Sequence, residues 1–240
     1  MKTIFNSISL IVIFLLLTSF KTVPNEVGVN KLKLTKITDG LDVTNFIYEN
    51  DLLHKTISTN PNNNYSSVSE YFYENGKVIK RSFYDLLSTG LKKNLITINY
   101  IYTGNLITSD MNNVESINYS NVYSYDTFGV LLNRKEFDSN GNLKNIYNYE
   151  YYGDGNLKQE LKLSGDESQI TEFLSYDLKN NPAKLFIPFQ LTIIDLISNN
   201  NLLSFGENTF EYEYNELNYP NKIIEKENGV IISTKILEYQ

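Results

Sequence analysis

The residues of this chain that could carry chemistry are few, and their types exclude several kinds of active site. The 240 residues include no cysteine, two arginines (Arg81 and Arg134) and one histidine, His54. Without cysteine there are no disulfides, thiolate metal sites or cysteine nucleophiles. One histidine cannot build a multi-histidine zinc site, and it leaves a single candidate for a Ser-His-acid triad. Since His54 follows a leucine pair in a strand-like run, we interpret it as an ordinary strand residue.

Oxygen ligands gather in Asp138-Ser139-Asn140-Gly141-Asn142, but their spacing is not that of a calcium loop. An EF-hand loop places ligands at alternate positions, followed by glycine and a glutamate at position twelve. Here Gly141 comes before the third ligand position, and Tyr149 occupies position twelve. The segment therefore predicts a hairpin turn, and we predict no metal, no other cofactor and no catalytic residue.

Carboxylates are abundant, with 28 Asp and Glu residues against 21 Lys and Arg. The net charge of −7 and a pI near 4.9 argue against a nucleic-acid partner. A paired-carboxylate polysaccharide hydrolase stays open as an alternative. However, most acids fall in predicted turns, as Asp126 and Asp154 do, or on a predicted water-facing strand face, as Glu150 and Glu160 do.

Tyrosine pairs recur along the chain and are the strongest candidates for either a core or a binding surface. The second members are 23 to 29 residues apart, except for one interval of 38, and they are Tyr48, Tyr73, Tyr102, Tyr125, Tyr151, Tyr176, Tyr214 and Tyr239. A tyrosine repeated at a fixed phase favours a cross-strand core ladder. The alternative is a platform for a glycan, with Tyr149 and Tyr151 as candidate binding residues.

Each repeat reads as strand, tight turn, strand, turn. Residues that tolerate positive φ follow each pair, as in Glu74-Asn75-Gly76-Lys77. The strand period is two: in 145–151 three tyrosines share one face. In 157–163 the same alternation puts Leu157, Leu161 and Leu163 on one face and Lys158, Glu160 and Lys162 on the other. We predict an all-β, up-and-down antiparallel meander of about fifteen strands, curled into an open or closed barrel-like sheet.

The long interval marks one short helical or irregular insertion at 183–198. It holds the chain's only alanine, Ala183, and is its most apolar stretch after the N-terminus. We expect a short helix from Pro188 to Ser198 that plugs or covers the sheet. The alternative is a partner-binding patch or a membrane-contacting loop. Phe186, Phe189 and Ile193 are its candidate binding residues.

The N-terminus is typical of an export signal. Lys2 supplies a positive charge and an apolar run follows from Ile8 to Leu17, too short to cross a bilayer comfortably. We predict a signal peptide at 1–19, a linker at 20–35 and one domain at 36–240. After signal removal no stable transmembrane span is expected. The protein would be exported to the periplasm, the outer-membrane surface or the medium.

The sequence of the predicted hairpins resembles the YD repeat of bacterial Rhs-like proteins, most clearly at 123–129, 137–143 and 149–157. Over about residues 36–240 the chain is similar to small exported YD-repeat-like lipoproteins of Bacteroidetes, the DUF4595-type group, which share a Tyr-Asp-x-x-x-Asn-Pro element, here 176–182. The resemblance implies a large curled antiparallel sheet, porin-like in outline, and no established activity. Phe20 stands where those lipoproteins carry a lipidated cysteine, so no lipid can be attached there.

These observations together predict an exported cell-envelope protein that is a non-enzymatic module, either structural or binding a ligand or partner, and the partner would be an envelope protein or a glycan. The hydrolase is one alternative and an outer-membrane β-barrel is another. Such a barrel needs an uncharged lipid face. Adjacent Lys80 and Arg81 instead put a charge on each face of one strand, as do Arg134 and Lys135.

Overall fold

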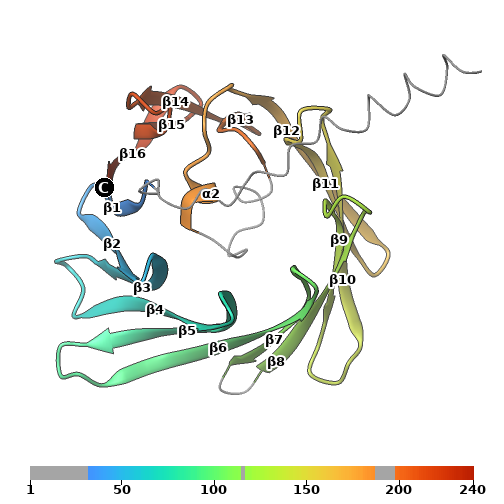
Figure 1. Cartoon of the computed structure of the whole chain (residues 1–240). Coiled ribbons are helices and arrows are strands. Elements are labelled where there is room, and N and C mark those ends of the chain that lie inside the picture. The colour runs from blue at the N-terminus through green and yellow to red at the C-terminus, as the bar shows by residue number, and fades with distance from the viewer. Residues whose placement is uncertain (1–31, 115–116, 187–197) are drawn as a thin grey trace, which may run out of the picture. The chain divides into compact units, whose positions relative to one another are not determined.

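Antiparallel strands follow one another in chain order around a closed ring (Figure 1). The computed structural model describes residues 32–114, 117–186 and 198–240, and Lys33–Gln240 forms one compact unit. Within these residues it has sixteen strands, and β16 pairs with β1 to close the barrel. The strands are β1 (Leu34–Asp39), β2 (Asp42–Glu49), β3 (Leu52–Thr59), β4 (Tyr65–Glu74), β5 (Lys77–Leu87), β6 (Lys92–Thr103), β7 (Leu106–Val114), β8 (Ile117–Tyr125), β9 (Leu131–Phe137), β10 (Leu143–Tyr151), β11 (Leu157–Ser164), β12 (Glu167–Tyr176), β13 (Leu202–Phe205), β14 (Asn208–Tyr214), β15 (Pro220–Glu227) and β16 (Val230–Tyr239).

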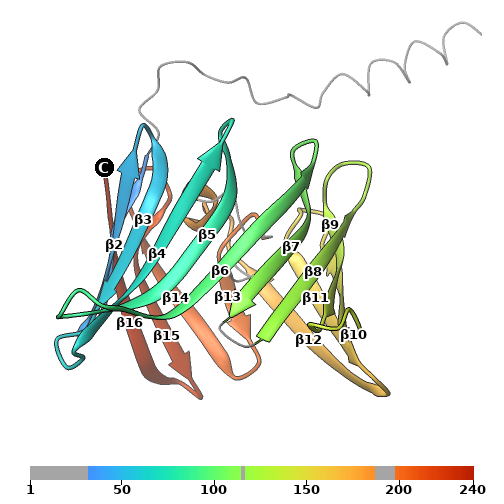
Figure 2. The same ribbon diagram turned by 90° about the horizontal axis from the view of Figure 1, so that it is seen from below.

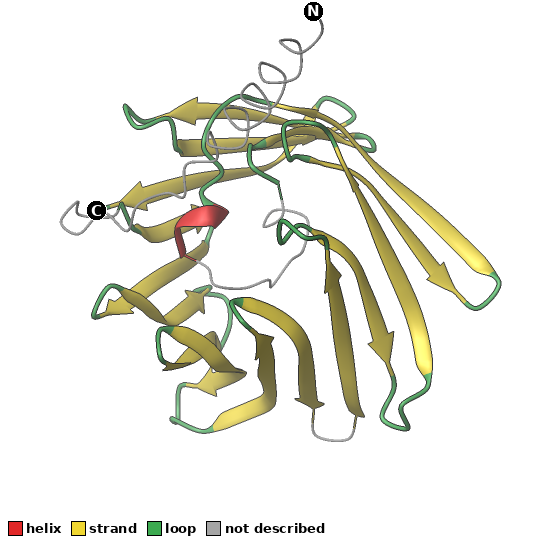
Figure 3. Ribbon diagram, turned by 45° about the vertical axis from the view of Figure 1, so that its right-hand side comes forward, coloured by secondary structure: helices red, strands yellow, loops and turns green. Residues whose placement is uncertain are grey.

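The all-β, up-and-down meander predicted from the repeat is confirmed, and the sheet that the sequence left open or closed is closed. Short turns join consecutive strands except β12 and β13, which the insertion joins, and the strands tilt across the barrel wall (Figure 2). One four-residue helix, α2 (Ala183–Phe186), is the only helix among the described residues, and it lies inside the ring of strands (Figure 3). No helix of the described part is long and apolar enough to cross a membrane.

The two faces of the sheet can be assigned from the segment that lies inside the ring. Ser198 Oγ, on that segment, donates to the hydroxyl of Tyr176 at 3.1 Å, so Tyr176 faces inward. Tyr176 belongs to a cluster of inward residues that runs around the barrel and includes Tyr71, Tyr100, Tyr123 and Tyr149, each 8% exposed or less. The tyrosines of 145–151 thus share one buried face, as predicted.

One predicted face assignment is wrong, and a β-bulge is the reason. Tyr149 pairs with Glu160, whereas Tyr151 pairs with Leu157, so Lys158 is an extra residue between the two pairs. An extra residue reverses the facing of everything beyond it. Leu157 therefore shares the inner face with Glu160, and Leu161 faces outward. Leu163 also faces outward and Lys162 inward, because Lys162 pairs with the inward Tyr147.

Candidate functional site

Tyrosine hydroxyls bind backbone carbonyls of the neighbouring repeat and form a belt around the inside of the barrel. Six of the repeat tyrosines donate in this way at 2.6–2.9 Å, in the pairs Tyr48 to Leu34, Tyr73 to Leu53, Tyr102 to Val78, Tyr151 to Leu131, Tyr176 to Leu157 and Tyr239 to Pro220. Every acceptor lies beside a shift in strand register. Because a bulge interrupts the regular ladder, its carbonyl needs another donor.

The belt shows how the tyrosine rows contribute to the core. Tyr151 uses its hydroxyl on the carbonyl of Leu131, and Tyr149 is 5% exposed. Burial raises the pKa of Tyr48 and Tyr73 to about 12, which keeps these hydroxyls protonated as donors. The two candidate binding residues on β10 thus take part in the core ladder that the sequence favoured, and their binding role stays a prediction.

An acid just after the end of a strand closes the turn that follows. One carboxylate oxygen of Asp138 accepts the backbone N–H groups of Asn140 and Asn142, both at 2.9 Å. Backbone hydrogen bonding from Asn142 holds the pKa of Asp138 below its ordinary value. Asp126 makes the same two bonds at 2.8 Å. The predicted hairpin turn is present at 138–142, and within the described residues no group of three His, Cys, Asp or Glu side chains could hold a metal ion.

The insertion between β12 and β13 is an enlarged version of this turn. The carboxylate of Asp177 accepts the N–H of Lys179 at 2.9 Å and that of Asn201 at 3.1 Å. In the regular turn the second partner is 4 residues further on, and here it is 24 residues further on. Asp177 N–H also donates to the Asn201 carbonyl at 3.0 Å. Both ends of the insertion are therefore fixed to the barrel by the chemistry of the repeat itself.

A buried asparagine holds the returning chain against the barrel. The side chain of Asn156 is fully buried; it donates to Asn200 Oδ1 at 3.1 Å and accepts Asn200 N–H at 2.8 Å. Asn199 Nδ2 donates to the Asp154 carbonyl at 2.8 Å. The sequence had marked Asn199 to Asn201 only as the end of the insertion. The partner Asn156 was missed, because nothing in its own turn distinguishes it from other turn asparagines.

The structure places the candidate binding residues of the insertion only in part. Phe186 is the last residue of α2. Phe189, Ile193 and most of the helix expected from Pro188 to Ser198 lie outside the described residues. Their binding role stays a prediction.

Both arginines face the inside of the barrel, together with several acids. Arg134 lies 3.9 Å from the centre of the Tyr147 ring, and Arg81 Nη2 donates to Ser69 at 2.9 Å. Burial raises the pKa of Glu160, although the charge of Arg134 opposes the rise. Sequence reasoning expected Glu160 on the water-facing side, and the bulge in β11 is the reason for the difference.

The buried acid Asp110 has a structural environment. Its exposed fraction is 5%, its Oδ1 accepts from Asn121 Nδ2 at 3.0 Å, and its Oδ2 accepts from the hydroxyl of Tyr123. A general acid or nucleophile needs a carboxylate oxygen directed at substrate. The hydrogen bonds of Asp110 join β7 to β8 instead. His54, on the bulge of β3, lies 3.6 Å from Glu49 and is 37% exposed.

A cavity of about 470 Å³ lies between the insertion and the barrel wall. Asn181, Ala183 and Ser198 form the side contributed by the insertion. Strands β1 and β13–β16 form the other side. Its polar wall residues include the pair Lys235 and Glu225, whose nitrogen and oxygen lie 3.8 Å apart. This volume is in the range of small-molecule sites.

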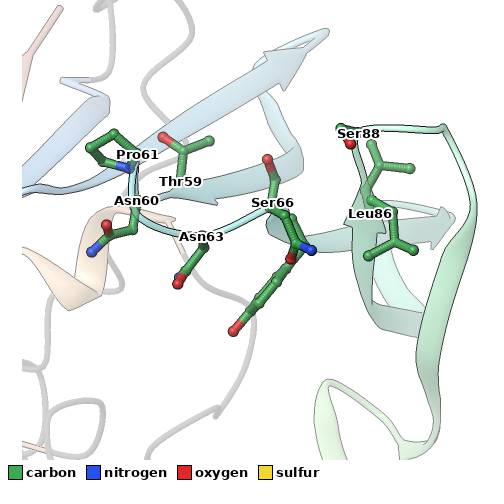
Figure 4. Close-up of a pocket in the computed structure, with 10 residues that line it drawn as sticks. Thr59, Asn60, Pro61, Asn63, Ser66, Leu86 and Ser88 are labelled. Carbon is green, nitrogen blue, oxygen red and sulfur yellow. The ribbon is translucent and has the colours of Figure 1, made fainter.

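A second hollow lies between the β3–β4 turn and the end of β5, with a volume of about 520 Å³ (Figure 4). Its lining includes Asn60, Pro61, Ser66 and Leu86 and contains no charged residue. Asn60 Oδ1 accepts the backbone N–H of Asn62 at 2.9 Å, so this amide serves the turn. The cavity beside the insertion is therefore the better candidate site.

No protein-family model and no curated protein sequence matches the chain. Among solved structures, it is similar to a porin-like protein from Bacteroides uniformis, with a TM-score of 0.54 and 10% identity over 87% of this chain and 96% of that one. A porin-like protein from Bacteroides vulgatus aligns over 87% of this chain and 99% of that one, with 15% identity and a TM-score of 0.40. At this identity the first likeness shows the fold, a porin-like barrel.

Proposed function

We propose that this chain is an exported, non-enzymatic barrel of the bacterial envelope that stands in water and binds a ligand inside its wall. The YD-repeat resemblance and the predicted signal at 1–19 support export to the periplasm, the outer-membrane surface or the medium. The cavity beside the insertion supports ligand binding. The observation that carries the proposal is the chemistry of the outward face.

Ion pairs lie on the outward face at several places around the barrel. Lys36 and Glu238 pair at 2.8 Å between the inward pairs Leu34–Tyr239 and Ile37–Leu237. Further outward pairs, at 2.5–3.4 Å, are Lys55–Glu70, Lys158–Glu150, Lys222–Glu213 and Lys226–Glu211. A lysine or arginine facing lipid at mid-membrane destabilises a barrel by about 2–4 kcal/mol. These lysines favour a wall that faces water.

The apolar residues of the outer face are interrupted by polar ones. Ile101 and Val122 are 54% and 41% exposed, but Ser109 lies between them. From β6 to β12 one outward row reads Ile101, Ser109, Val122, Lys135, Ile146, Leu163 and Ser168. A lipid-facing band would require an apolar residue at nearly every position. Strand β13 also has only 4 residues, against the 9–11 typical of a membrane strand.

The porin-like fold itself favours the competing function, an outer-membrane barrel. The experiment expresses the full chain in a bacterial host, fractionates the envelope, and washes membranes with high salt before detergent. A water-exposed barrel leaves with the soluble or salt-washed fraction and gives a β-sheet circular dichroism spectrum without detergent. Recovery of folded protein only with detergent would overturn the proposal and favour the outer-membrane barrel.

Ligand binding is proposed over hydrolysis because the inward acid Asp110 is engaged in hydrogen bonds between strands. An activity screen on polysaccharides tests this choice. Turnover of a glycan by the purified protein would establish the hydrolase instead.

A further inference from the structure

We infer that the cavity beside the insertion takes an uncharged amphipathic molecule, with an apolar body and a hydroxyl or amide end group. The inference rests on the proposed function, since it names the class of ligand that a water-exposed barrel of this kind would hold. Three features of the cavity carry it: its size, its apolar wall, and the separated ion pair in that wall.

The cavity is too large to be a packing defect. Protein interiors contain few voids larger than a water molecule. At about 30 Å³ per water-sized volume, its 470 Å³ has room for roughly 10 to 15 non-hydrogen atoms. A chain of about ten carbons with a small head group is a suitable occupant.

The wall opposite the insertion is mainly apolar. Its apolar residues include Leu34 and Ile37 from β1, Phe210 from β14, Ile223 from β15 and Leu237 from β16. Leu34 and Leu237 are only 1% and 4% exposed, so the wall is held in place by its neighbours. Apolar surface of this extent favours a hydrocarbon body over a fully hydroxylated one.

The ion pair in the wall selects the end group. Lys235 Nζ and Glu225 Oε2 are 3.8 Å apart, which is longer than a hydrogen bond. Glu225 Oε1 already accepts from Asn208 Nδ2 at 2.9 Å. A second acid, Asp39, pairs with Lys235 in register and accepts from Ser233 at 2.9 Å.

This arrangement disfavours a charged ligand of either sign. A carboxylate would face Glu225 beside its one cation, and an ammonium group would face Lys235. Each would lose its hydration without gaining a free counter-ion. A hydroxyl or primary amide both donates and accepts, so it can donate to Glu225 and accept from Lys235 across the 3.8 Å gap.

The experiment compares three probes that share one apolar chain: decan-1-ol, decanoate and decylammonium. Binding to the full chain is measured by calorimetry below the concentration at which the probes form micelles. We expect decan-1-ol to bind at least about tenfold more tightly than either ion.

Two variants change the net charge of the cavity wall. They distinguish the contribution of the ligand's head group from that of its apolar chain. Glu225→Gln leaves Lys235 without its counter-ion, and decanoate should then bind about tenfold more tightly than it binds the unchanged protein. Lys235→Met should do the same for decylammonium. Matched controls are Glu211→Gln and Lys226→Met, an outward ion pair at 2.5 Å on the neighbouring strands β14 and β15, which should leave all three affinities unchanged.

A third variant keeps the inference testable if the first two variants do not fold. Ile223→Phe narrows the cavity without changing a charge and should weaken decan-1-ol binding at least about tenfold while the circular dichroism spectrum is retained. Head-group selection is overturned if Glu225→Gln and Lys235→Met leave the affinities for decanoate and decylammonium unchanged. Absence of binding by all probes to folded protein overturns the cavity inference but not the water-exposed barrel, which the detergent-free fractionation tests separately.

Discussion

The tyrosine belt predicts that single hydroxyl groups stabilise the barrel by a measurable amount. Tyr73 donates to the carbonyl of Leu53 at 2.7 Å, and Leu53 is 4% exposed. Tyr73→Phe keeps the ring and removes only this bond. A typical hydrogen bond contributes about 0.5–1.5 kcal/mol, and a buried acceptor left unpaired costs about 1–3 kcal/mol. We expect a loss of about 1–2 kcal/mol, or roughly 2–8 °C in Tm for a protein of this size.

The measurement is urea unfolding followed by far-ultraviolet circular dichroism, with Tyr65→Phe as the control. Tyr65 begins the same strand, β4, but is 38% exposed, so its substitution should change the free energy of unfolding by less than about 0.5 kcal/mol. Tyr151→Phe tests the belt in a distant repeat, and the two losses should add. If Tyr73→Phe and Tyr65→Phe are equally stable, the belt is only a consequence of packing and the reasoning is wrong.

Two further predictions follow from the same contacts. Gly155 has φ +83°, and a Cβ there would lie 2.4 Å from Asn199 Nδ2. Gly155→Ala should therefore destabilise the protein by about 1–3 kcal/mol, more than Gly141→Ala at φ +80° with open space around it. Thermal unfolding of both variants, and of Gly155→Ala with Asn199→Ala, checks this; equal losses would exclude the clash. Burial raises the pKa of three belt tyrosines, Tyr48, Tyr73 and Tyr102, from 10.0 to about 12, so they stabilise the fold fully below pH 10.0 and lose that contribution as pH rises toward 12. The part of the phenolate absorbance that Tyr48→Phe, Tyr73→Phe and Tyr102→Phe remove should appear in that window together with the change in circular dichroism. Its appearance near pH 10.0 without unfolding would contradict the assignment.

Much of the fold could be predicted because each strand and turn of the repeat is determined by residues within that strand or turn. Tyrosine alternation gives the inner face, and Asp138 with Gly141 gives a turn. The turn at 215–219 lacks glycine, yet Asn218 takes its place at φ 61°. Asparagine tolerates this conformation, so the turn of the repeat is kept although asparagine replaces glycine.

The facing of residues after each bulge could not be predicted. A bulge is defined by pairing with another strand, and nothing inside 157–163 marks Lys158 as the extra residue. The error moved Glu160 from the inner face to the outer one. The cavity chemistry could not be predicted for a similar reason, because Glu225 on β15 is found beside Lys235 on β16 only once the register of these strands is known.

Closure of the barrel depends on the same tyrosine chemistry at the seam. Tyr48 donates to the carbonyl of Leu34, and Leu34 pairs with Tyr239, which donates in turn to Pro220. The belt thus continues from the last repeat into the first, and the seam between β16 and β1 resembles any other junction between repeats.

The belt changes where the insertion enters. Tyr214 occupies a repeat position, but its hydroxyl donates to the carboxylate of Asp177, the residue that starts the enlarged turn. The cavity lies in this sector, between β13–β16 and the insertion. In the regular repeats, six tyrosine hydroxyls join neighbouring repeats through backbone carbonyls. Space for a ligand arises where one tyrosine is redirected to hold the insertion, so the break in the repeat, rather than the repeat, is where function is to be sought.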